Sequence, residues 1–65
     1  MNIKIERLKL RLTQKDLADK IGVTPNTIVR WEANPEGIPG AALIAMAELF
    51  GCSTDYLLER SAAHD

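Results

Sequence analysis

The sequence is poor in the residues that build metal sites, disulfides and catalytic centres. It contains one cysteine, Cys52, and one histidine, His64, among 65 residues. One cysteine excludes an internal disulfide and a cysteine-based metal cluster. His64 is the penultimate residue, where chains usually fray. The sequence also lacks a nucleophile–base pair and a phosphate-binding loop, so it indicates no enzyme, metal, cofactor or small-molecule ligand. We expect Cys52 to be a small buried apolar residue.

Long apolar runs are missing as well. No stretch approaches the roughly 18 consecutive apolar residues of a membrane-spanning helix, and no signal-peptide pattern opens the chain. We therefore expect a cytoplasmic protein without a membrane partner. A length of 65 residues and an apolar fraction of 46% are typical of one small globular domain. We expect that domain to span residues 1–65, with an ordered core at about residues 2–60.

Net charge is low, at −1, which is unusual for a protein that binds nucleic acid. The charges are unevenly distributed, however. Residues 1–31 carry seven basic and three acidic side chains, whereas residues 32–65 carry one basic and six acidic side chains. This division can present a basic face to phosphate, or it can be a chance asymmetry of a solvated surface.

Strand signals are nearly absent, whereas helix-start signals recur at short intervals. Asn2 is a candidate N-cap for a first helix that runs to about residue 11. Thr13 precedes a second helix, and Asp16 follows it in the spacing of a capping box. Thr24 and Pro25 begin a third helix, because the first helical position needs no amide partner.

Glycine and proline divide the second half of the chain. Residues 33–40 contain two prolines and two glycines, so we expect a loop there. Gly51 ends a fourth helix and Ser53 caps a short last one. The apolar face of the fourth helix has the spacing i, i+3, i+4 and i+7 in Leu43, Met46, Ala47 and Phe50. The sequence therefore predicts an all-α fold, a compact bundle of five short helices.

The connection between the second and third helices spans only residues 22–24 and begins with Gly22. A turn of three or four residues that contains glycine is typical of a helix-turn-helix. Ala18 is small where the two helices would cross, and Gly22 permits the positive φ that a sharp turn needs. Ile28 and Trp31 supply apolar contacts from the third helix to the core. We expect Trp31 to be a core residue and not a stacking platform for bases.

The segment QKDLADKIGVTPNTIVRWE resembles the helix-turn-helix of the phage repressor and Cro family of DNA-binding domains. The segment AMAELFGCSTDYLL is similar to the last two helices of that family, so the resemblance covers roughly residues 3–60. It implies a lambda-repressor-like fold and a sequence-specific transcriptional regulator, a repressor or Cro-like protein. It also implies that the third helix, at about residues 25–33, reads the major groove of double-stranded DNA, and that a homodimer binds a palindromic operator.

In the family, the N-terminal residues of the third helix contact base edges. The matching positions here are Thr24, Pro25, Asn26 and Thr27, with Arg30 one turn later. Thr27 is suited to contact either a phosphate or a thymine methyl. Asparagine pairs with adenine and arginine with guanine through two hydrogen bonds each, so we expect Asn26 and Arg30 to read bases. Pro25 departs from the polar residue common in the family and offers only van der Waals contact. The alternative is that Asn26 and Thr27 are simply polar residues of a first helical turn.

The resemblance also implies contacts to phosphate. The family uses a glutamine at the position of Gln14 to hold phosphate and brace the third helix, and free amides at a helix N-terminus favour an anion. Further candidates for phosphate contact are Arg11, Thr13, Lys15 and Thr27. For Lys15, a solvated helix face is an equally good explanation.

The family positions that match Arg7 and Glu32 form a salt bridge between the first helix and the end of the third. The resemblance therefore implies a structural ion pair between these two residues. Breaking one side of such a pair, if it is buried, costs about 3–5 kcal/mol.

The sequence departs from the family in the loop at residues 33–40, which contains Glu36 and no basic residue. Family members often carry basic residues there, so we expect a flatter salt dependence of DNA binding. Apolar residues beyond the main helical faces indicate either a dimer surface or additional core packing: Ile38, Ile44, Tyr56, Leu57 and Leu58.

Two other functional classes are consistent with the net acidity and the acidic loop. One is a protein-interaction module that retains the fold without binding DNA. The other is an antitoxin-type regulator that binds both DNA and a partner protein. Loss of DNA binding at low salt would distinguish the first of these from a transcriptional regulator.

Overall fold

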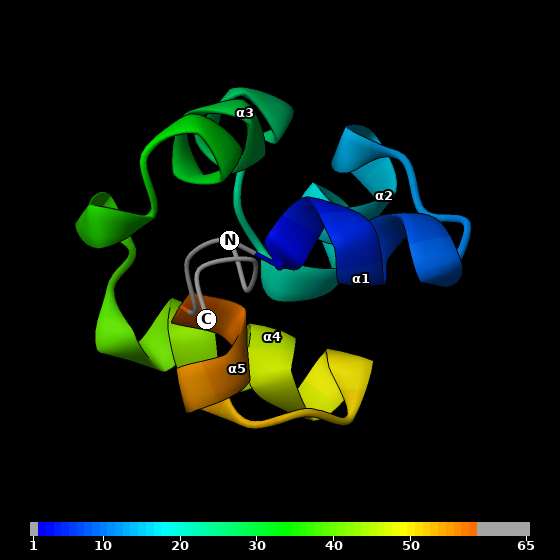
Figure 1. The fold of residues 1–65 in the computed structure, drawn as a ribbon. Helices are drawn as coiled ribbons and strands as arrows, with labels where there is room; N and C mark the ends of the chain where they lie inside the picture. Colours follow the sequence, from blue (N-terminus) through cyan, green and yellow to red (C-terminus); the bar gives the residue numbers. More distant parts are fainter. Residues whose placement is uncertain (1, 59–65) are drawn as a thin grey trace.

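The computed structural model describes residues 2–58, which form five α-helices and one short 3₁₀ helix without any strand. In chain order they are α1 (Ile3–Lys9), α2 (Gln14–Ile21), α3 (Pro25–Ala33), η1 (Pro35–Gly37), α4 (Gly40–Phe50) and α5 (Thr54–Leu58). Figure 1 shows α3 at one end of the molecule and α4 with α5 at the other. The predicted all-α architecture is confirmed. The expected end of the ordered core near residue 60 and the position of His64 lie outside the described residues.

The helix-turn-helix forms where the sequence predicts it. Thr13 Oγ1 accepts a hydrogen bond from the Asp16 amide at 3.0 Å, and Asp16 Oδ2 accepts one from the Thr13 amide at 2.9 Å, so the capping box is complete. Gly22 ends α2 with φ of 89°, a left-handed conformation that glycine adopts without steric cost. Thr24 then caps α3, with Pro25 at the first helical position.

The first helix differs from the prediction at both ends. The Asn2 side chain makes no capping hydrogen bond and instead donates to the backbone carbonyl of Tyr56, at the far end of the chain. The last residue of α1 is Lys9, two positions earlier than expected. Arg11 follows with φ of 59°, and Leu12 N–H donates to the carbonyl of Arg7 at 3.0 Å. This geometry is a Schellman motif, in which glycine usually occupies the left-handed position.

The core draws side chains from all five α-helices. Trp31 is 6% exposed and belongs to it, as expected. Burial of each large apolar side chain contributes about 1.5–3 kcal/mol, so the cluster fixes how the helices pack. The buried apolar residues are Ile3, Leu17, Ala18, Ile28, Trp31, Met46, Ala47 and Leu57.

For Leu57, the dimer surface is ruled out and the alternative, additional core packing, is correct. Its side chain is completely buried, so it cannot form part of an exposed surface. Ile38 and Tyr56 are half-buried and pack against the core, whereas Ile44 and Leu58 are 54% and 44% exposed. The exposed apolar surface of α4 and α5 is therefore smaller than the sequence indicated.

Candidate nucleic-acid interface

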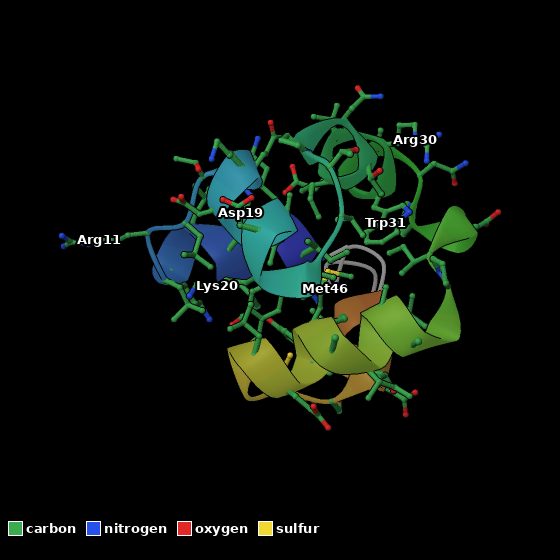
Figure 2. The ribbon with its side chains drawn as sticks, turned by 180° about the vertical axis from the view of Figure 1, so that it is seen from behind. Arg11, Asp19, Lys20, Arg30, Trp31 and Met46 are labelled. Carbon is green, nitrogen blue, oxygen red and sulfur yellow. The ribbon has the colours of Figure 1, made fainter. Side chains whose placement is uncertain are left out.

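The outward face of α3 carries the two polar residues expected to read bases. Ile28 and Trp31 are buried on the opposite side of the helix and fix its rotation. Asn26 and Arg30 are four positions apart, which places them on one helical face, and both are exposed. Neither side chain hydrogen-bonds to another residue within 2–58. Figure 2 shows Arg30 at the end of the molecule where α3 lies, and its side chain lines an open hollow with Trp31, Asn34 and Gly37.

The first turn of α3 is occupied by capping interactions. Thr24 Oγ1 accepts a hydrogen bond from the Thr27 amide at 3.3 Å, and the two threonine hydroxyl oxygens lie 2.9 Å apart. Thr24 and Pro25 are exposed, and Thr27 is half-buried. These three residues therefore form the start of the helix, and base contact by Thr24 and Pro25 stays a prediction.

The N-terminus of α2 lies beside α3 in the helix-turn-helix (Figure 1). The backbone amides of Gln14 and Lys15 donate to no acceptor within the described residues. Free amides at a helix N-terminus attract anions. The Asp16 carboxylate works against this attraction, although the capping box turns one of its oxygens toward the amide of Thr13.

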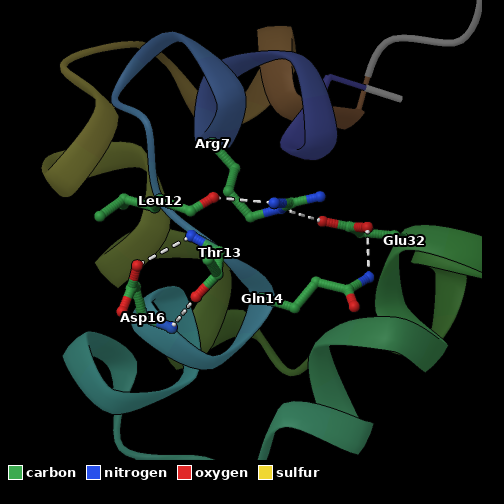
Figure 3. A network of polar contacts seen from close by, with 6 residues as sticks. All are labelled: Arg7, Leu12, Thr13, Gln14, Asp16 and Glu32. Atoms are coloured by element: carbon green, nitrogen blue, oxygen red, sulfur yellow. Dashed lines mark hydrogen bonds and ion pairs between the residues drawn. The ribbon is translucent and has the colours of Figure 1, made fainter.

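A hydrogen-bonded network joins α1, α2 and α3 (Figure 3). Arg7 Nε lies 2.7 Å from Glu32 Oε2, so the expected ion pair is present, and both side chains are nearly buried. The Arg7 guanidinium also donates to the carbonyl of Leu12 at 2.8 Å. Gln14 Nε2 donates to Glu32 Oε1 at 3.0 Å. This contact fixes the Gln14 side chain against α3 and leaves its second amide hydrogen for another acceptor.

Two other candidate phosphate ligands are exposed. Lys15 Nζ lies 3.2 Å from Asp19 Oδ2, and both side chains are more than half exposed, so this pair contributes little stability. Arg11 projects away from the body of the protein, as Figure 2 shows. Its hydrogen-bonding groups contact no other side chain within 2–58.

Val29 is not among the residues predicted for this face. Its side chain is 43% exposed on α3, three residues after Asn26 and next to Arg30. The relevant signal was its spacing from Asn26, since positions i, i+3 and i+4 share one face of a helix.

A second polar cluster ties α1 to α5, away from the outward face of α3. Glu6 Oε2 accepts hydrogen bonds from Lys9 Nζ at 3.0 Å and from the Tyr56 hydroxyl at 2.9 Å. These two donors lower the pKa of Glu6, and the carboxylate raises the pKa values of Lys9 and Tyr56. Cys52 is half-buried against the core, and burial raises the pKa of its thiol. We assign this cluster a structural role, because the polar groups of Glu6, Lys9 and Tyr56 hydrogen-bond to one another.

Residues 2–58 contain no group of three or more histidine, cysteine, aspartate or glutamate side chains able to hold a metal ion. None of the helices in that range is long and apolar enough to cross a membrane.

Comparisons with known proteins agree with this geometry. Residues 3–57 match the protein family described as helix-turn-helix. Repressor protein C2 of Salmonella phage P22 is 35% identical over 57 residues, which cover 88% of this chain and 26% of the relative. The chain thus spans about a quarter of the length of that curated relative. No solved structure matched the chain. On the matched residues and the observed fold, the chain belongs to the phage repressor and Cro-type family of helix-turn-helix DNA-binding domains.

Proposed function

We propose that the protein is a sequence-specific transcriptional regulator of the repressor or Cro-like type, and that α3 enters the major groove of double-stranded DNA. The main support for this proposal is the outward face of α3. Asn26 and Arg30 are exposed there without partners among the described residues, so stability does not explain them. An amide and a guanidinium at this spacing match adenine and guanine edges, at about 1–3 kcal/mol of discrimination for each paired contact.

Phosphate contacts on both sides of the groove complete the proposed complex. The free amides of Gln14 and Lys15 can donate to a phosphate at the N-terminus of α2, and the hydrogen bond to Glu32 holds the Gln14 side chain against α3. Arg11 reaches a neighbouring phosphate from the turn between α1 and α2. Thr13 adds a hydroxyl contact from the cap of α2, and Thr27 adds one from the first turn of α3.

We also propose a homodimer on a palindromic operator, in which the two copies of α3 lie about one DNA turn, roughly 34 Å, apart. The exposed side chains of Ile44 and Leu58 support it, because they leave apolar surface on α4 and α5. Two further apolar residues of the second half of the sequence, Ile38 and Tyr56, are partly exposed.

The test begins with selection of binding sites from random duplexes at low salt, followed by gel shifts on the selected site. The double variant Asn26→Ala/Arg30→Ala should lose discrimination between the selected site and random DNA, because both base contacts are gone. Lys4→Ala is the matched control, since it removes one exposed cation from α1 and should retain discrimination. If the double variant discriminates as well as the wild type, α3 does not read bases through these two residues.

A protein-interaction module is the second candidate, favoured by the net charge of −1 and by the absence of lysine and arginine from residues 33–40. The selection of binding sites from random duplexes distinguishes the interaction module from the regulator. A wild-type protein that binds no duplex at low salt would exclude the regulator and leave the interaction module.

A further inference from the structure

Val29 is an exposed apolar residue in the middle of α3. A β-branched side chain loses rotational freedom in a helix, so valine lowers helix stability relative to alanine. Burial usually offsets that loss, but Val29 is 43% exposed, whereas its neighbour Ile28 is completely buried. Folding therefore accounts for a valine at this position less well than for Ile28, because more than two fifths of the side chain stays in contact with water.

The position of Val29 relative to the two polar residues is specific. Asn26, Val29 and Arg30 occupy i, i+3 and i+4, so their side chains are neighbours on the surface of α3. All three are exposed. The outward face thus presents an amide, an isopropyl group and a guanidinium side by side.

We propose that Val29 is a specificity-determining residue that selects thymine by packing against its C5-methyl group. This inference rests on the proposed function, namely that α3 lies in the major groove. The thymine methyl is the one apolar group among the base edges in that groove, and apolar side chains recognise it by contact. Opposite any other base, the isopropyl group would cover a donor or acceptor without replacing its hydrogen bond to water, which disfavours that base.

Replacement of thymine by uracil tests this contact, because uracil retains base pairing and lacks only the methyl group. Each thymine of the selected site is replaced singly by deoxyuridine, and affinity is measured for the wild type and for Val29→Ala. The wild type should lose roughly fourfold in affinity at one position of each half-site, the effect expected for one buried methyl group. For Val29→Ala, the ratio of thymine to uracil affinities at that position should fall to about one.

Two controls separate recognition from folding. Leu8→Ala removes an apolar side chain that is 54% exposed on α1, and it should retain the wild-type sensitivity to uracil. Val29→Ala should melt close to the wild-type temperature, since the higher helix propensity of alanine opposes the loss of a side chain that is only partly buried.

The outcomes are distinct. A selected site without a thymine-to-uracil effect, or a Val29→Ala variant with the wild-type ratio at every position, overturns the assignment of Val29 and leaves DNA binding intact. Failure to select any duplex overturns the proposed function and this inference together.

Discussion

Arg7 Nε and Glu32 Oε2 lie 2.7 Å apart and join α1 to the last turn of α3. The other carboxylate oxygen of Glu32 accepts from Gln14 Nε2 at 3.0 Å, so one carboxylate holds three helices together. The side chains of Arg7 and Glu32 are only 8% and 10% exposed. A pair this far from water depends on both partners, because either charge alone would be desolvated without compensation.

Either single substitution, Arg7→Ala or Glu32→Ala, should therefore lower the free energy of unfolding by about 3–5 kcal/mol. The double variant Arg7→Met/Glu32→Leu should lose less than the sum of the two, since it leaves no buried charge behind. Urea denaturation followed by circular dichroism measures all three. Single variants within about 1 kcal/mol of the wild type would show that the pair behaves like a surface salt bridge.

Arg11 occupies a backbone conformation that suits glycine, with φ of 59°. The left-handed conformation costs a non-glycine residue about 1–2 kcal/mol. Part of this cost is offset, because arginine has less backbone entropy to lose on folding than glycine has. We expect Arg11→Gly to raise the free energy of unfolding by up to about 1 kcal/mol. The same variant should bind DNA more weakly and reduce the salt slope by about one, because a phosphate contact is lost.

Arg11→Ala serves as the control for this effect, since it removes the guanidinium but retains the strained φ. It should weaken DNA binding like Arg11→Gly without the gain in stability. Thermal denaturation and salt-dependent gel shifts measure the two quantities separately. Equal stability of the glycine and alanine variants would contradict the strain argument.

Most helix boundaries could be predicted because caps act locally. Thr13 recognises an amide three residues away, and Gly22 needs only its own φ, so short-range rules were sufficient. The end of α1 could not be predicted, because Arg11 takes the conformation that those rules assign to glycine. Asn2 was misassigned for a different reason, since its side chain is drawn to a carbonyl 54 residues away, that of Tyr56.

The candidate site was predictable in part. The resemblance placed Asn26 and Arg30 on α3, and helical spacing explains why they share a face. It did not distinguish Leu57 from Leu58, because two adjacent leucines in a five-residue helix look alike until α5 packs on α4. Val29 was missed because an apolar residue in a helix is normally read as a core residue.

Acid should destabilise the protein through Glu6. Its pKa is lowered by hydrogen bonds from Lys9 and Tyr56, so the carboxylate contributes stability above the unfolded-state pKa. As pH falls below the ordinary value of 4.5, that contribution declines, and it is gone below the lowered folded-state pKa. Unfolding free energies measured between about pH 7 and pH 3 should show this decline in the wild type.

Glu6→Gln should flatten that acid dependence, since the titrating group is removed. Tyr56→Phe should reduce it, because one of the two donors that lower the pKa of Glu6 is lost. A Glu6→Gln variant whose stability falls with acid as steeply as that of the wild type would assign the decline to another carboxylate, such as Asp16, whose pKa the Thr13 cap lowers.

The proposed dimer can be tested at Ile44, which is 54% exposed on α4. Ile44→Glu places a carboxylate in the proposed contact, so it should shift the protein toward monomer in sedimentation and abolish cooperative binding to a palindromic site. Ile5→Glu is the matched control, because Ile5 is 49% exposed on α1 and outside the proposed contact. Binding of an isolated half-site should be similar in both variants, since neither touches α3. A wild-type protein that remains monomeric on a palindromic duplex would show that Ile44 and Leu58 are ordinary exposed side chains, of which most folded surfaces carry several.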